Sequence, residues 1–356
     1  MKILEIKNLS LRSIKNKTLL LKNVNLTLNK GEVLGIAGES GSGKTLMGLT
    51  ITKLLDPAIF EILSGEIIYD DNDILKCSED YLRSIRTKKI SMVFQEPMLS
   101  LNPVQTIKTQ LYEVIKLHIT KNQNDIEHLS KNIITQIGLY DFDKILSSYP
   151  HMLSGGQRQR IMMAIALVCK PDILIADEPT TALDVTLQLQ ILDLLKDFKI
   201  KNNMSMILVS HDLDLIKNYT DRIIILKNGL IIEEGITENI FENPVTDYTK
   251  QLISSTPDRI VTAKASDIKI LETNNLSCRF PLNNSFFLKN RKYFSALSDI
   301  QIYINEGETI GIVGESGSGK TTLAMAIMQL LDYSGQIIFN EKDFSQLSNK
   351  DIRKYR

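Results

Sequence analysis

Short apolar segments alternate with segments of helical length along the first two thirds of the chain. The short segments are apolar or rich in residues that favour β-strands: 33–37, 90–94, 173–176, 207–210 and 222–226. The longer segments, which have the length of helices, are 45–55, 104–117, 157–169 and 185–199. Alternating strands and helices predict an α/β fold around a mixed, largely parallel sheet.

The chain also contains an internal repeat. Residues 31–45 read GEVLGIAGESGSGKT, and residues 307–321 read GETIGIVGESGSGKT. Two copies of one domain are the natural interpretation. The resulting division is a first domain at 1–255, a polar linker at 256–268 and a second copy at 269–356. The repeat ends about where the first copy reaches Arg86, so we expect the second copy to be an N-terminal fragment that exposes apolar edges and is poorly stable alone.

The composition is that of an ordinary globular protein. Hydrophobic residues make up 43% of the chain and charged residues 24%, and 42 basic residues balance 42 acidic ones. This neutral balance gives no indication of a nucleic-acid partner. The longest apolar runs have about nine residues, whereas a helix that crosses a bilayer needs about 20. With no signal-peptide core at its start and three widely separated cysteines, the chain is expected in the cytoplasm.

A glycine-rich motif follows the apolar segment at the start of each repeat. Its sequence, GESGSGKT, fits GxxxxGK[ST], in which backbone N–H groups between a strand and a helix bind nucleotide phosphates. Two matches within one repeat disfavour the alternative of a glycine-rich turn without a ligand. The nucleotide-binding candidates of the first copy are Gly38, Ser40, Gly41, Ser42, Gly43, Lys44 and Thr45. Those of the second copy are Gly314, Ser316, Gly317, Gly319, Lys320, Thr321 and Thr322.

Two acidic residues end the apolar segment at 173–176. A carboxylate at a strand end beside a phosphate loop can hold Mg²⁺, and we assign this role to Asp177 together with the hydroxyl of Thr45. Glu178 can then polarise the attacking water as a general base. A solvated pair of acids is the alternative, and the presence of the phosphate loop argues against it.

The sequence LSGGQ at 153–157 begins another helical segment. Ser154 followed by two glycines is typical of a helix N-cap, whose free N–H groups can also bind an anion. Together with the phosphate loop and the ILIADE segment, LSGGQ resembles the signature of ABC transporter ATP-binding subunits, and the resemblance covers nearly the whole chain. It implies a P-loop NTPase fold with a helical signature subdomain. It also implies that two domains pair head to tail, with each ATP between one phosphate loop and the other domain's signature.

The resemblance gives roles to further residues. Gln95 resembles the Q-loop glutamine that senses Mg²⁺ and the nucleophilic water, and His211 resembles the switch histidine that contacts the γ-phosphate. Asp184 belongs to a D-loop in which Thr181 replaces the usual serine. The implied catalytic residues are Glu178, His211, Gln95 and Lys44, and the implied metal ligands are Thr45, Gln95 and Asp177. The implied signature and D-loop contacts to ATP are Ser154, Gly155, Gly156, Gln157 and Asp184.

A subfamily is indicated as well. The segment QEPMLSLNP at 95–103 and the Pro244…Tyr248-Thr249 tail resemble oligopeptide/dipeptide importer ATPases, and two fused copies are similar to the microcin C and glutathione importer types. The implied function is ATP hydrolysis that powers the import of peptides or similar small solutes. The implied partners are integral-membrane permease subunits, a solute-binding protein and a second ATPase domain, at the inner face of the cell membrane. Because 235–260 contains no cysteine, we expect no iron–sulfur cluster.

Two departures from the family pattern leave alternatives open. Adenine stacks on an aromatic residue in the family, and this residue is Phe280 in the second copy but Ser13 in the first. We therefore expect weaker nucleotide binding at the first site than at an intact second one. The second copy lacks the Q-loop, signature, acids and switch histidine. The chain is therefore an importer ATPase that works by pairing of two first domains, or a truncated nucleotide-binding remnant without turnover. A soluble ABC ATPase acting on ribosomes or DNA is a third alternative, which the neutral charge disfavours.

Overall fold

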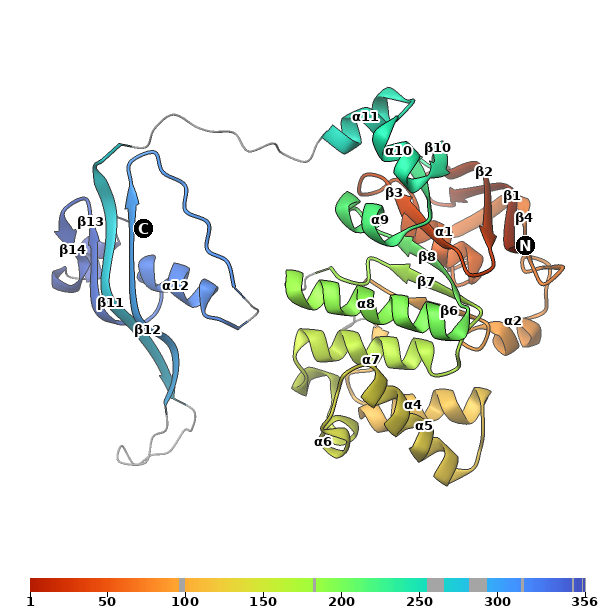
Figure 1. The fold of residues 1–356 in the computed structure, drawn as a ribbon, viewed down its shortest axis with the longest axis horizontal. Helices are drawn as coiled ribbons and strands as arrows, with labels where there is room; N and C mark the ends of the chain where they lie inside the picture. The colour runs from red at the N-terminus through yellow and green to blue at the C-terminus, as the bar shows by residue number, and fades with distance from the viewer. Residues whose placement is uncertain are drawn as a thin grey trace. The chain divides into compact units, whose positions relative to one another are not determined.

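The computed structural model describes residues 1–95, 100–181, 184–254, 266–281, 293–314, 317–347, 349–353 and 355. The chain forms two compact units that divide near residue 256 (Figure 1). The first unit contains two sheets with their helices, and the described residues of the second contain one sheet with the short helices α12 and α13.

Strands and helices alternate through most of the first unit. Its strands are β1 (Lys2–Ser13), β2 (Leu19–Asn29), β3 (Val33–Ala37), β4 (Phe60–Tyr69), β5 (Asn72–Asp73), β6 (Ile90–Val93), β7 (Ile173–Asp177), β8 (Ser205–Val209), β9 (Arg222–Lys227) and β10 (Leu230–Ile236). Its helices are α1 (Lys44–Ile51), α2 (Glu79–Ile85), α4 (Ile107–His118), α5 (Gln123–Gln136), α6 (Phe142–Ser147), α7 (Gly155–Leu167), α8 (Val185–Asn202), α9 (Leu213–Tyr219), α10 (Thr237–Glu242) and α11 (Asp247–Ser254). A 3₁₀ turn at Pro150–Met152 precedes α7.

The larger sheet of the first unit carries the elements that position the site. Its strand order is β10-β9-β3-β8-β7-β6, and all neighbours run parallel except β10, which is antiparallel to β9. The prediction of a mixed, largely parallel sheet is confirmed, and each predicted apolar segment forms one of its strands. Because parallel strands end at the same edge, the segments that follow β3, β6, β7 and β8 lie close together.

The core of the first unit lies on both faces of this sheet. Leu34 and Ile36 of β3 pack toward the smaller sheet and α1, whereas Val33 and Ala37 pack toward the helices on the opposite face. This division follows from the pleat, since successive side chains of a strand point to opposite faces. Burial on both faces is the reason that these strands are almost entirely apolar in sequence.

A second, antiparallel sheet with the order β2-β1-β4-β5 completes the first unit and was not predicted from the sequence. Only one face of β1 is covered, so its buried residues alternate with polar ones. Leu4, Ile6, Leu9 and Leu11 are buried, whereas charged and polar residues lie between them. The sheet packs on the larger one through these apolar side chains.

The helices α4, α5 and α6 pack together and against α7, which forms the helical part that the resemblance implied (Figure 1). The helix α4 begins at Ile107 rather than at 104, because the side chain of Thr106 caps it by accepting a hydrogen bond from the Thr109 N–H at 3.3 Å. Among the helices in the described part of the chain, none is both long and apolar enough to cross a membrane.

The second unit repeats the smaller sheet of the first. Its elements are β11 (Lys269–Pro281), β12 (Tyr293–Asn305), α12 (Lys320–Ile327), β13 (Ser334–Phe339), β14 (Lys342–Asp343), a 3₁₀ turn at Phe344–Gln346 and α13 (Asn349–Ile352). The strand order β12-β11-β13-β14 corresponds to β2-β1-β4-β5 of the first unit. A small core of its own holds β11, β13 and α12 together.

Residues 309–313 of the second unit correspond to β3 in the repeat but form no strand. In the first unit, β3 is paired on one side by β8 and on the other by β9. The described residues of the second unit provide no strand in either position. Ile312 is therefore 46% exposed and Val313 is 93% exposed, which confirms the expected exposure of apolar residues.

Candidate functional site

The phosphate loop of the first unit joins the buried strand β3 to α1. Gly38 has φ 151° and Gly43 has φ 109°, which are backbone conformations that favour glycine. A Cβ on Gly38 would lie 2.1 Å from the carbonyl oxygen of Leu226 in β9, so no other residue fits there without movement of the backbone. The glycines thus let the loop turn tightly against β9 before the helix begins.

The Lys44 side chain folds back into this loop. Its Nζ donates hydrogen bonds to the carbonyl oxygens of Gly38 at 2.7 Å and Glu39 at 2.9 Å, and the residue is 5% exposed. Burial lowers the pKa of Lys44, and the nearby charges of Glu178 and Asp177 partly offset this effect. The ammonium therefore lies inside the loop, where an anion would relieve the cost of its burial.

The hydroxyl of Ser42 also points to a ligand. Ser42 is 4% exposed, and its Oγ has no hydrogen-bond partner among the described residues. A buried hydroxyl without a partner is costly and uncommon in folded proteins. The orphaned hydroxyl, the buried ammonium and the glycine-lined turn together fit the phosphate chain of a nucleotide.

Asp177 lies at the end of β7, next to the start of α1. The Thr45 hydroxyl donates a hydrogen bond to Asp177 Oδ1 at 3.2 Å, and Asp177 is 1% exposed. Burial raises the pKa of Asp177, and the charge of Glu178 adds to this effect, while the Thr45 hydrogen bond and Lys44 act in the opposite direction. A buried carboxylate oxygen beside a hydroxyl oxygen is the kind of donor pair that Mg²⁺ prefers, so these two residues fit the predicted metal site.

Three side chains contact the Glu178 carboxylate, two of them from distant parts of the chain. Gln95 Nε2 donates to Glu178 Oε2 at 2.8 Å, and Thr181 Oγ1 donates to the same oxygen at 3.0 Å. His211 Nδ1 lies 3.0 Å from Glu178 Oε1. Gln95 follows β6, Glu178 follows β7 and His211 follows β8, so the parallel sheet brings the three predicted residues together.

The backbone of Glu178 is itself constrained. Its φ is 46°, a left-handed conformation that is uncommon for a residue other than glycine, asparagine or aspartate. The Glu178 N–H donates to the Val209 carbonyl oxygen at 2.9 Å, which holds the turn against the end of β8.

The signature residues form the start of α7. Ser154 Oγ accepts a hydrogen bond from the Gln157 N–H at 3.3 Å, and Gln157 Oε1 accepts one from the Ser154 N–H at 3.0 Å. These bonds make a capping box and stay within the first turn, so they do not join the signature to the phosphate loop of the same unit. A Cβ on Gly155 would meet no atom within 4 Å, whereas a Cβ on Gly156 would lie 2.2 Å from Leu187 of α8, so the turn is open at Gly155 and packed against α8 at Gly156.

Asp184 caps the next long helix. Its Oδ1 accepts a hydrogen bond from the Leu187 N–H at 2.9 Å at the start of α8. The two D-loop residues before it, Ala182 and Leu183, lie outside the described residues. The structure therefore gives Asp184 a structural role at this helix, beside any contact to a nucleotide.

The second unit contains a loop of the same sequence in a different setting. Lys320 Nζ donates to the Gly314 carbonyl oxygen at 2.7 Å, and Gly314, Gly317 and Gly319 have φ of 155°, 84° and 95°. The predicted residue Ser316 lies outside the described residues. Thr321 and Thr322 lie in the first turn of α12. Within this unit, the described residues contain no counterpart of Asp177 or Glu178.

The two residues expected at the adenine position lie at the ends of corresponding strands. Phe280 near the end of β11 is 38% exposed and pairs with Phe294 of β12. Ser13 ends β1 and pairs with Phe60 of β4. The structure thus places an exposed aromatic ring at this position only in the second unit's β11.

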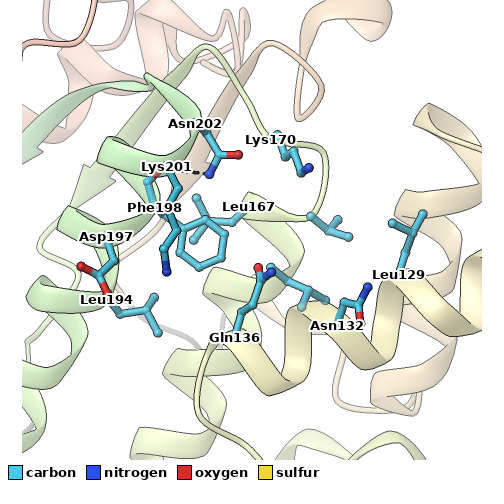
Figure 2. Close-up of a pocket in the computed structure, with 12 residues that line it drawn as sticks. Leu129, Asn132, Gln136, Leu167, Lys170, Leu194, Asp197, Phe198, Lys201 and Asn202 are labelled. Carbon is cyan, nitrogen blue, oxygen red and sulfur yellow. Dashed lines mark hydrogen bonds between the residues drawn. The ribbon is translucent and has the colours of Figure 1, made fainter.

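A cavity of about 430 Å³ lies elsewhere in the first unit. Figure 2 shows side chains of α5 and α8 around it, Leu129, Phe198 and Lys201 among them. None of its lining residues belongs to the phosphate loop or to the surroundings of Glu178. Lys44 and Asp177, whose pKa values are shifted, and Glu178, whose backbone is left-handed, lie instead at the phosphate loop, so we place the functional site there.

Sequence reasoning missed two contacts at this site. It named Thr181 only as a replacement for serine, whereas the structure has its hydroxyl on Glu178. It named Tyr248 only as part of a subfamily tail, whereas the Tyr248 hydroxyl accepts a hydrogen bond from the Glu39 N–H at 3.4 Å. The contact of Tyr248 joins residues 209 positions apart, so no local pattern signals it. Thr181 lies only three residues after Glu178, so this spacing was the signal that could have indicated its contact.

Comparison with known proteins agrees with this geometry. The sequence profile of a family described as "ABC transporter" matches residues 21–181 and 297–356. The chain is 39% identical over 335 residues to the peptidoglycan transport ATP-binding protein YejF of Agrobacterium fabrum, and the match covers 94% of this chain and 61% of that protein. It is 36% identical over 369 residues to the glutathione import ATP-binding protein GsiA of Salmonella choleraesuis, with coverage of 94% and 59%.

A solved structure is similar as well. The dimeric structure of a post-hydrolysis state of the ATP-binding cassette MJ0796 bound to ADP and Pi matches with a TM-score of 0.59 and 30% identity. That match covers 66% of this chain and 98% of the other. The chain thus spans about three fifths of the length of the two curated relatives. The solved cassette is matched over almost its whole length by about two thirds of this chain.

Proposed function

The chain belongs to the ABC transporter family, and on this premise we propose that it binds and hydrolyses ATP to power an importer of peptides or similar small solutes. The observation that carries the proposal is the arrangement at Glu178, whose carboxylate meets Gln95 and His211 beside the phosphate loop. The names of two relatives, which specify glutathione import and peptidoglycan transport, support the solute class.

The chemistry follows from the groups in place. The N–H groups of the loop and the Lys44 ammonium bind the phosphates and stabilise the charge that develops during transfer. Glu178 is the general base that takes a proton from the attacking water, and Gln95 with Thr181 holds its Oε2 in direction. His211, whose Nδ1 lies 3.0 Å from Glu178 Oε1, contacts the γ-phosphate in this proposal. Mg²⁺, held by Thr45, Asp177 and Gln95, would neutralise charge on the β- and γ-phosphate oxygens.

A complete site requires a second ATPase domain. The hydrogen bonds of Ser154 and Gln157 stay within the first turn of α7, and this turn faces open space at Gly155. We propose that the turn binds ATP held by the phosphate loop of a second domain, since helix N-termini favour anions. The dimeric state of the similar cassette that was solved with ADP and Pi supports such pairing.

The remaining partners are integral-membrane permease subunits and a solute-binding protein, with the chain at the inner face of the cell membrane. A cavity of about 230 Å³ is lined by Phe94, the residue before Gln95, and by further apolar side chains that include Leu54 and Met92, with Arg86 and a few hydroxyl side chains among them. Leu54 is 45% exposed. An apolar recess next to the residue that contacts Glu178 is a suitable place for a permease segment, because movement there would reach the site.

The test of the function is the substitution Glu178→Gln in the full chain. We expect the ATPase kcat to fall by about 10²- to 10⁴-fold while Mg·ATP still binds, because the amide keeps the shape but cannot act as a base. The matched control is Glu66→Gln, which changes a surface carboxylate paired with Lys76 at 3.2 Å. Turnover by wild type that survives Glu178→Gln would refute the assigned role, and binding without any turnover by wild type would favour a nucleotide-binding remnant.

A further inference from the structure

The segment after β10 returns to the phosphate loop through one side chain. Tyr248 of α11 is 9% exposed, and its hydroxyl accepts a hydrogen bond from the Glu39 N–H at 3.4 Å. The ring of the same tyrosine lies against Lys227 of β9, whose Nζ is 4.0 Å from the ring centre. Such a close cation–π contact holds the ring in place. The tail therefore makes a directed polar contact with the loop, in addition to covering it.

The loop residue that Tyr248 contacts is central to the loop's internal bonding. The Glu39 carbonyl oxygen accepts hydrogen bonds from Lys44 Nζ at 2.9 Å and from the Ser42 N–H at 3.2 Å. The peptide group that joins Gly38 to Glu39 is thus held at the Glu39 N–H by the tail and at the Gly38 carbonyl by Lys44 Nζ at 2.7 Å. Any rotation of this peptide would move the carbonyl away from Lys44 and disturb the cradle that binds phosphate.

The tail is anchored independently of the loop. Glu233 of β10 is 9% exposed, and its carboxylate accepts hydrogen bonds from the Val245 N–H at 2.8 Å and the Thr246 N–H at 3.1 Å. The Thr246 hydroxyl donates a further bond to Glu233 at 3.0 Å. Burial alone would raise the pKa of Glu233, but these hydrogen bonds lower it, so the carboxylate stays ionised. This anchor fixes the chain just before α11 and so fixes where Tyr248 reaches the loop.

From these contacts we infer that Tyr248 is a positioning residue for the phosphate loop and that the anchored tail sets the affinity of the site for nucleotide. The inference rests on the proposed function, because it concerns the same site. If the tail had a purely structural role, loss of the Tyr248 hydroxyl would lower stability but leave nucleotide binding unchanged. A positioning role predicts instead that nucleotide binding weakens. The loop binds the phosphates shared by ATP and ADP, so the effect belongs to binding and not to the chemical step.

The experiment compares Tyr248→Phe with wild type in the full chain. This change keeps the ring beside Lys227 and removes the hydroxyl that accepts the hydrogen bond from the Glu39 N–H. Loss of one such hydrogen bond predicts that Kd for Mg·ATP and for Mg·ADP, and KM for ATP, rise by about three- to tenfold while kcat stays within about twofold. The control is Tyr219→Phe, which removes a hydroxyl that donates to Asp193 Oδ1 at 3.1 Å, and it should leave all four constants unchanged.

A second variant tests the tail without touching the loop or Tyr248. Glu233→Gln weakens the anchor, and we expect it to raise Kd for Mg·ATP by a factor similar to that of Tyr248→Phe. Unchanged Kd in both variants, with wild type binding Mg·ATP, would overturn the positioning role and leave the proposed function intact. Failure of the wild type to bind Mg·ATP would refute the proposed function and this inference with it.

Discussion

The substitution Gly38→Ala tests whether the phosphate loop has the tight backbone described above. Gly38 has φ 151°, and a Cβ there would lie 2.1 Å from the Leu226 carbonyl oxygen, so the loop or β9 has to move. A strained backbone costs about 1–3 kcal/mol, and forcing extra volume into a packed site costs a further 1–3 kcal/mol or so. We therefore expect the free energy of unfolding to fall by about 3 kcal/mol, measured without nucleotide.

The matched control is Gly41→Ala in the same loop. Gly41 has φ 81°, but a Cβ there would meet no atom within 4 Å, so only the backbone strain of about 1 kcal/mol applies. Scanning calorimetry of the nucleotide-free chain should show a drop in Tm of about 10 °C for Gly38→Ala and roughly a third of that for Gly41→Ala. Equal drops in Tm for the two variants would refute the reasoning, because the contact with Leu226 would then carry no cost.

Two further predictions concern charge and stacking. Burial holds the pKa of Asp177 above its usual value, so ionised Asp177 destabilises the metal-free fold progressively as pH rises above the usual Asp pKa. Asp177→Asn should therefore raise Tm by a few degrees at pH 7 in a chelator, with the difference vanishing toward acid pH; a lower Tm at pH 7 would contradict this sign. Ser13→Tyr should tighten ATP binding about tenfold by supplying a ring for adenine, as fluorescent-nucleotide titration would show, and unchanged Kd would remove the stacking argument.

The larger sheet could be predicted from the sequence because its strands are buried on both faces. Such strands are continuous apolar runs, and all five runs identified in the sequence became neighbouring strands. The smaller sheet could not be predicted in the same way, since the apolar residues of β1 alternate with charged and polar ones. Helix ends depended on single capping residues such as Thr106, which shifts the start of α4 to Ile107.

The candidate site was predictable where a motif names its residues and not where distant segments meet. The phosphate loop, the acids after β7 and the residues Gln95 and His211 all follow from the sequence and from the family resemblance. The contact of Tyr248 with Glu39 joins residues 209 positions apart, and no periodicity or motif encodes it. The two loops have identical sequences, and yet only the first follows a paired strand. This difference was not visible in the sequence of the loops, because it depends on whether β8 and β9, or strands like them, flank the segment before the loop.

The central claim is that the phosphate loop of the first unit binds Mg·ATP, because it holds the buried Lys44 ammonium and lies beside Asp177 and Glu178. The most direct measurement is titration calorimetry of Mg·ATP with Lys44→Ala and with Lys320→Ala, which truncate the same lysine in two loops of identical sequence. The account predicts clear binding by wild type that survives Lys320→Ala and is lost in Lys44→Ala. Binding that survives Lys44→Ala and disappears in Lys320→Ala, or no heat with well-folded wild type, would contradict it.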